Sequence, residues 1–137
     1  MLEDVRKTDL KLARTMVTTA HALAMTAERA ERSDDYAAWR ANINVAFGRV
    51  LAAAALLAHS YDCEPERTEI HLTAIRIAIQ SGFFRRTDEL IRSARESDTM
   101  PDAFIDEMEQ LESELSRARS GSLADALAGA DAQHATA

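Results

Sequence analysis

Five residues of the types that bind metals or transfer protons lie close together near the middle of the chain. They are His59, Asp62, Cys63, Glu64 and His71. Histidine and cysteine are common zinc ligands, and a loop can bring three such side chains onto one ion. The spacing contains neither a Cys-x-x-Cys pair nor a His-Glu-x-x-His sequence, which are the specific zinc patterns. We therefore expect no metal site, and we interpret His59 as a cation that stabilises a helix C-terminus.

The same segment offers a nucleophile next to a base. Cys63 follows His59 by four positions, so a helix would place the thiol beside the imidazole. No glycine turn accompanies the pair, and the chain contains neither Gly-x-x-x-x-Gly-Lys nor Gly-x-Gly-x-x-Gly. We predict that the protein is not an enzyme and has no cofactor.

Two arginines stand alone in apolar stretches. Arg49 is the only Asp, Glu, Lys or Arg of residues 41–58, and Arg76 is the only one of residues 70–84. A buried guanidinium needs an acceptor, because an unpaired internal charge costs several kcal/mol. Either both side chains are structural, paired with a carboxylate or with helix-end carbonyls or reaching water along their stems, or they line an anion pocket between the second and third helices.

An aromatic pair sits beside several arginines. Phe83 and Phe84 are followed directly by Arg85 and Arg86, and Arg92 lies two turns further along the expected helix. Aromatic residues and arginine are enriched at the energetic centres of protein interfaces. We predict a partner-binding surface at these five residues, with insertion of the phenylalanines into the core at a turn as the alternative.

The segment from Ser81 to Arg95 resembles the helix-turn-helix portion of ribbon–helix–helix antitoxins. The similarity lies in Ser-Gly, an aromatic residue, the capped Thr-Asp-Glu and Ile-Arg-Ser-Ala, over 15 of the 137 residues. It implies a DNA-binding regulator that uses residues 67–95. Residues 67–72 would be the strand in the major groove, and Thr87 with Arg85 and Arg86 would contact phosphate.

The composition favours a soluble helical protein over a nucleic-acid binder. The chain has 47% hydrophobic residues, four glycines, two prolines and a net charge of −7. An acidic balance disfavours a broad phosphate-binding surface but leaves a local basic patch open. A single cysteine is typical of reducing compartments, and we find no signal region and no apolar run that could span a membrane. We expect a cytoplasmic location.

Hydrophobic periodicity predicts an all-α antiparallel bundle of about five helices. A long N-terminal hairpin (3–32 and 35–59) is followed by three shorter helices (65–81, 87–96 and about 101–119). Residues 1–119 would form one domain, and residues 120–137 a flexible Gly/Ala/Ser tail. We expect the second helix to be central and buried, with the seam Tyr36, Trp39, Ile43, Phe47, Val50, Ala54, Leu57 and Tyr61.

Local signals mark the helix ends. Ser33, Asp34 and Asp35 can cap the second helix, Gly82 can end the third, and Thr87 can cap the fourth. Residues 70–79 fit either a helix or a short strand, because isoleucines alternate in this stretch. The pattern as a whole favours a non-catalytic helical protein–protein interaction or regulatory module of the cytoplasm. Its partner would be another protein, and a homodimer is an alternative state.

Overall fold

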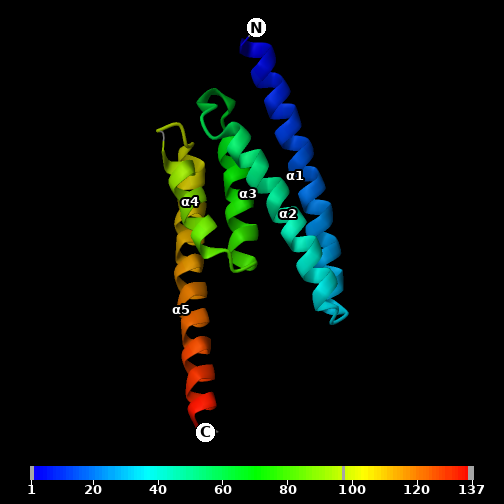
Figure 1. Ribbon diagram of the computed structural model, residues 1–137. Helices are drawn as coiled ribbons and strands as arrows, with labels where there is room; N and C mark the ends of the chain where they lie inside the picture. The colour runs from blue at the N-terminus through cyan, green and yellow to red at the C-terminus, as the bar shows by residue number, and fades with distance from the viewer. Residues whose placement is uncertain (1, 97, 136–137) are drawn as a thin grey trace.

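The computed structural model describes residues 2–96 and 98–135. In these residues the chain forms five α-helices joined by short loops and two 3₁₀ turns, and successive helices run in opposite directions (Figure 1). The helices are α1 (Leu2–Arg32), α2 (Tyr36–Leu57), α3 (Glu66–Gln80), α4 (Phe84–Arg95) and α5 (Ile105–Ala135), with 3₁₀ turns η1 (Tyr61–Cys63) and η2 (Asp102–Phe104). The predicted all-α bundle with an N-terminal hairpin is confirmed.

A tight turn closes the α1–α2 hairpin. The Asp35 N–H donates to the carbonyl of Ala30 at 2.8 Å, and the Asp34 N–H donates to that of Glu31 at 3.1 Å. This is the Schellman pattern, which requires a left-handed residue after the helix. Asp34 takes that conformation, with φ of 59°. Asp35 Oδ1 then accepts from the Ala38 N–H, so Asp35 is the residue that caps α2.

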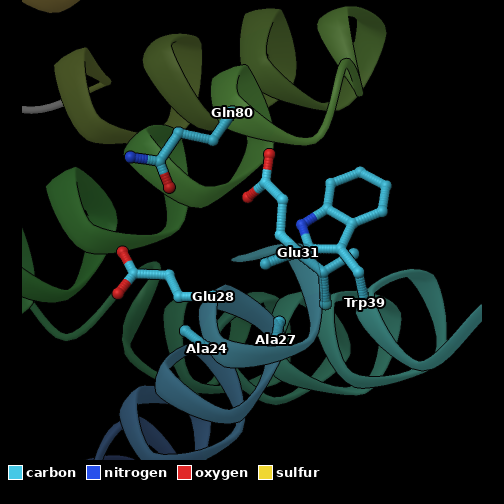
Figure 2. Close-up of a pocket in the computed structure, with 7 residues that line it drawn as sticks. Ala24, Ala27, Glu28, Glu31, Trp39 and Gln80 are labelled. Carbon is cyan, nitrogen blue, oxygen red and sulfur yellow. The ribbon is translucent and has the colours of Figure 1, made fainter. Parts of the chain in front are cut away.

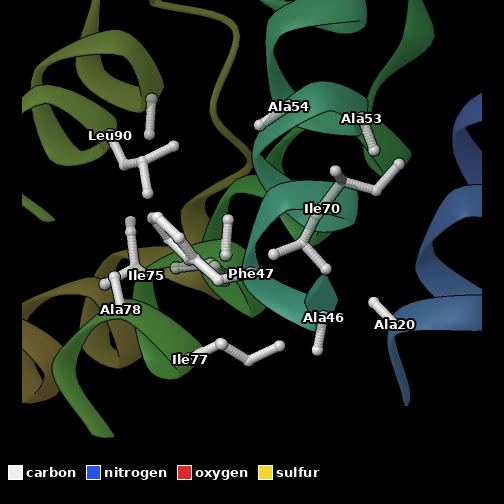
Figure 3. Packing of buried hydrophobic residues seen from close by; sticks show 14 of the residues in the cluster. Ala20, Ala46, Phe47, Ala53, Ala54, Ile70, Ile75, Ile77, Ala78 and Leu90 are labelled. Carbon is white, nitrogen blue, oxygen red and sulfur yellow. The ribbon is translucent and has the colours of Figure 1, made fainter. Parts of the chain in front are cut away.

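Small residues let α1 and α2 pack closely. Ala13, Ala20 and Ala27 recur every seven positions and are at most 1% exposed. Ala46 and Ala53 are buried on α2 at the same spacing, and Figure 3 shows Ala20 and Ala46 on facing sides of the two helices. A residue without a long side chain at these positions lets the helix axes approach. The seam therefore joins the hairpin with little side-chain volume between its helices.

The adjoining stripe of α2 forms the centre of the core. The predicted seam residues Ile43, Phe47, Val50, Ala54 and Leu57 are buried there. Figure 3 shows this face meeting Ile70, Ile75, Ala78 and Leu90 from α3 and α4.

One end and one side of α2 remain open. Tyr36, predicted to lie in the seam, is 66% exposed, because the hairpin tip extends past the end of α3 (Figure 1). Val45 is 49% exposed and Arg49 is exposed, so this side of α2 faces solvent, although we expected α2 to be buried.

α3 settles the choice between helix and strand for residues 70–79. Both faces of this stretch carry buried residues, so the alternating isoleucines fit a helix buried between neighbours. Gly82 ends α3 as predicted, with φ of 78°. The Phe83 N–H donates to the carbonyl of Ala78 and the Gly82 N–H to that of Ile79, which is a second Schellman pattern.

α4 and α5 pack antiparallel, with ion pairs across their contact. Arg95 at the end of α4 pairs with Glu112, and Arg119 pairs with Asp88 near the start of α4. The predicted fourth helix begins earlier than expected, at Phe84. Thr87 therefore lies inside its first turn, where its hydroxyl donates to the Phe83 carbonyl, and it is not the N-cap residue.

α5 is longer than predicted. It is as long as α1 and continues to Ala135, well beyond the expected end at residue 119, so the helix crosses the predicted boundary between domain and tail. Its first half buries Met108, Leu111 and Leu115 against the other helices, and its second half extends past them (Figure 1). Flexibility of residues 120–137 stays a prediction. No helix among the described residues is long and apolar enough to cross a membrane.

Candidate functional site

A buried arginine holds the ends of three helices together. Arg67, in the first turn of α3, has a fully buried side chain. Its Nε donates to the Ala58 carbonyl at 3.0 Å, and its Nη2 donates to the Ser93 carbonyl at 2.6 Å. Nη1 donates to the Ala94 carbonyl at 3.4 Å. The guanidinium thus joins the C-terminal ends of α2 and α4, where carbonyls lack helical partners and the helix dipoles are negative.

Glu64 compensates the charge of Arg67. A Glu64 carboxylate oxygen lies 3.5 Å from Arg67 Nη1, and its side chain is only 12% exposed. The same carboxylate accepts from the Thr68 N–H at 2.8 Å and from the Thr99 hydroxyl at 3.1 Å. The Tyr61 ring covers the guanidinium, with its centroid 5.0 Å from Cζ. Each buried polar group therefore has a partner, as burial requires.

His71 extends this network from α3 to α4. Its Nδ1 lies 2.8 Å from the Arg67 carbonyl oxygen, which can only accept, so Nδ1 carries the proton. Nε2 then accepts from the Ser93 hydroxyl at 3.0 Å. Burial lowers the pKa of His71 below its usual 6.5, so the neutral ring is favoured. We call Glu64, Arg67, His71 and Ser93 the Arg67 junction.

The Ser93–His71 pair has the spacing of a nucleophile and its base. Ser93 also lines an open hollow of about 360 Å³ between α2 and α4. However, Ser93 lies inside α4, whose backbone N–H groups are used within the helix, so they do not form an oxyanion hole. In this structure the pair links α3 to α4 within the Arg67 junction.

The five residues considered as metal ligands make different contacts in the structure. Glu64 and His71 belong to the Arg67 junction, and His59 Nδ1 lies 3.3 Å from the Tyr61 hydroxyl. Cys63 is buried, at 8% exposure. Within residues 2–96 and 98–135, no three His, Cys, Asp or Glu side chains are placed to hold one metal ion.

The structure does not bring Arg49 and Arg76 together. Arg49 is exposed on α2. Arg76 pairs with Glu107 of α5 and keeps 44% of its side chain exposed. The hollow beside Arg76, about 220 Å³, lies between α3 and α5 and is not lined by Arg49. Arg76 with its carboxylate partner and the exposed Arg49 fit the structural alternative, and the arginine that binds helix-end carbonyls is Arg67.

The strand that the ribbon–helix–helix resemblance requires is absent. Residues 67–72 belong to α3, and Arg67, Thr68, Ile70, His71 and Leu72 are buried there. A buried helical segment cannot enter a DNA groove as a strand. The resemblance is therefore limited to a helix that follows a glycine turn, and the prediction of a strand at residues 67–72 is wrong.

The predicted aromatic surface is divided between the core and the outside. The Phe83 ring packs tilted against Phe47, with centroids 4.8 Å apart, so Phe83 is partly buried against the core at the turn. Phe84 is half-buried, and Arg119 lies over its ring at 5.9 Å.

The arginines near this turn remain at the surface. Arg85 and Arg92 are exposed. Arg86 is also exposed and pairs with Glu89 one turn along α4, at 3.0 Å. Phe84 and these arginines are open to a partner, and Phe83 is partly exposed while it packs against the core.

Two hollows lie one after the other along α1, and we treat them together as a groove between α1 and α3. α1 and α3 run in the same direction, and Arg14 of α1 pairs with Glu66 of α3 at 2.9 Å where the groove begins. Two hollows of about 390 Å³ and 310 Å³ follow along one stripe of α1. The α1 residues of this stripe are Arg14, Val17, Thr18, His21, Ala24, Ala27, Glu28 and Glu31. We call this the α1–α3 groove; at 1.5 Å per residue it is about 26 Å long.

The two hollows differ in chemistry. The first has Val17 and Ile70 between charged and polar side chains that include His21 and Glu69. The second lies at the C-terminal ends of α1 and α3, where Figure 2 shows Gln80 of α3 opposite two glutamates of α1.

Sequence reasoning missed both the Arg67 junction and this groove. Arg67 lies among Glu64, Glu66 and Glu69, so it looks like a solvated charge in the sequence. The available signal was Glu64, three residues before Arg67 and next to Pro65 at a helix start. The groove left no such signal, because it depends on which two helices lie side by side.

Comparisons with protein-family models, with curated proteins and with solved structures find no match to this chain.

Proposed function

We propose that the protein is a non-catalytic helical module that binds another protein by holding one of its helices in the α1–α3 groove. The observation that carries this proposal is the groove itself: two aligned hollows along a single stripe of α1. An amphipathic helix can dock its apolar face into such a groove between two helices. Val17 and Ile70 supply apolar contact, and the charged side chains along the edges supply orientation.

The absence of catalytic function is part of this proposal. Its support is that His71 and Ser93, the best-placed acid–base pair, are hydrogen-bonded into the junction that fixes α2, α3 and α4. We also place the protein in the cytoplasm, because its sole cysteine, Cys63, is buried and cannot form an internal disulfide.

Two matched threonines on α1 allow a test. Thr18 lines the groove, whereas Thr26 does not; both are exposed, and each donates to the carbonyl four residues earlier. Thr18→Trp fills the groove without touching the core, and Thr26→Trp adds the same side chain outside it. Both variants should keep the wild-type helical circular dichroism.

The readout is affinity capture from a lysate of the native host, followed by direct binding measurements with the captured protein. We expect Thr18→Trp to lose a partner that the wild type and Thr26→Trp retain. Equal binding by all three proteins would show that the groove is not the interface.

A further inference from the structure

The second hollow of the α1–α3 groove has an acidic rim and apolar walls. Its volume is about 310 Å³, and its lining residues are Ala24, Ala27, Glu28, Glu31, Trp39, Ile43 and Gln80. In Figure 2 the carboxylates of Glu28 and Glu31 and the amide of Gln80 surround the opening, with the indole of Trp39 at one side. We call it the Trp39 pocket. It lies at the lower end of the size range of ligand pockets, roughly 300–1,000 Å³, which suits one side chain.

The charges around the Trp39 pocket favour a cation. Within the described residues no ion pair involves Glu31, and Glu28 lies 4.0 Å from Arg32, with both side chains mostly exposed. Such an exposed pair is weak and can exchange for another cation. α1 ends at Arg32 and α3 at Gln80, so the negative ends of two helix dipoles also lie here.

The walls suit an aliphatic stem. Ala27 is 1% exposed and Ile43 is 7% exposed, so they form a closed floor, and the apolar surface left open to a ligand is that of Ala24 and the Trp39 indole, which are both partly buried. Lysine and arginine side chains bury their methylene groups on such surfaces while their charged ends stay near polar groups. The Gln80 carbonyl and the two carboxylates offer acceptors to the several N–H donors of a guanidinium.

We propose that the Trp39 pocket binds the guanidinium or ammonium group of an arginine or lysine on the partner helix in the α1–α3 groove. The inference rests on the proposed function and adds the chemistry of the partner: a helix with a basic residue at the end of the groove near the α1–α2 turn. An anionic side chain would be repelled by both glutamates.

The chain contains its own reporter, because Trp39 is the only tryptophan. The probe is n-butylguanidinium, which carries the head and part of the stem of arginine. Its uncharged isostere, n-butylurea, is the ligand control. The readouts are Trp39 fluorescence and the indole N–H signal in a proton–nitrogen NMR correlation spectrum. A ligand this small should saturate at millimolar concentration.

The variants compare the pocket with carboxylates elsewhere. Glu28→Gln with Glu31→Gln removes both pocket charges. Asp106→Asn with Glu109→Gln removes two charges at exposed positions on α5 and changes the net charge equally. We expect n-butylguanidinium to shift the indole signal of the wild type and of the α5 variant, with at least fivefold weaker binding to the pocket variant. n-Butylurea should leave the signal unchanged.

Two results would overturn the inference: no indole shift with n-butylguanidinium up to about 20 mM, or equal affinity of the pocket variant and the wild type. Failure of the proposed function gives a different pattern. In that case Thr18→Trp would leave partner binding unchanged, whatever the response of the Trp39 indole.

Discussion

Replacing Arg67 by methionine tests whether the Arg67 junction holds the bundle together. Methionine keeps much of the side-chain volume but removes the charge and the donors to the carbonyls of Ala58, Ser93 and Ala94. It also leaves Glu64, which is only 12% exposed, without its cation. Removing one partner of a buried ion pair costs about 3–5 kcal/mol. Since whole domains are stable by about 5–15 kcal/mol, we expect a large loss of stability.

The assay is urea denaturation followed by helical circular dichroism. The matched control is Arg14→Met, because Arg14 pairs with Glu66 at 2.9 Å while 59% of its side chain is exposed. Exposed pairs contribute about 0–1 kcal/mol, so this variant should unfold at nearly the wild-type urea concentration. A loss in Arg67→Met no larger than that in Arg14→Met would refute the role we assign to the junction.

A second variant separates charge from packing. Adding Glu64→Gln to Arg67→Met removes the unpaired carboxylate, while the glutamine oxygen can still accept from the Thr68 N–H. We expect the double variant to be more stable than the sum of the single changes predicts, by about 1–3 kcal/mol, because contacting residues couple. Strict additivity would mean that the two side chains do not interact.

Further measurements follow from burial, backbone conformation and packing. The pKa of His71 is lowered in the folded protein, so the unfolded chain takes up the proton first as pH falls below 6.5. The urea midpoint should therefore be lower at pH 5 than at pH 7.5, and the difference should be smaller in His71→Gln. An equal difference in both proteins would contradict this. Gly82 has φ of 78°, so Gly82→Ala should lower the free energy of unfolding by about 1–2 kcal/mol. Asp34 has φ of 59°, so Asp34→Gly should raise it by about 0.5–1 kcal/mol. Thermal melts measure both changes, and the reverse order would be inconsistent with the two left-handed turns. Ala20→Leu should destabilise by about 1–3 kcal/mol because Ala20 has no exposed surface, while the exposed Ala22→Leu should not; equal melting temperatures would refute the close α1–α2 seam.

Local chemistry in the sequence was enough to predict the helices and most of their ends. Asp35 caps α2 and Gly82 ends α3, because a side-chain oxygen and a left-handed glycine act within a few residues of their own position. The apolar seam of α2 followed from its spacing, and its error at Tyr36 arose because the sequence does not say how far α3 reaches.

The start of α4 and the length of α5 were also predicted incorrectly from local sequence. Thr87 has a good capping side chain, yet α4 begins three residues earlier, at Phe84, where the Phe83 ring is fixed against Phe47. The small and polar residues after position 119 were predicted to be a tail, and the helix continues through them to Ala135. In both cases local propensity was outweighed by longer-range packing or by continuation of a formed helix.

The sequence by itself determined the helical class, the hairpin and the kind of acceptors that a buried arginine needs, because these depend on periodicity and on the cost of an unpaired charge. Only the tertiary structure decided which arginine is buried and where a partner could bind. Arg67 is enclosed because the ends of α2 and α4 meet above it, and the α1–α3 groove exists because α1 and α3 pack on adjoining stripes of α2. Such contacts join residues far apart in the chain, and no local pattern specifies them.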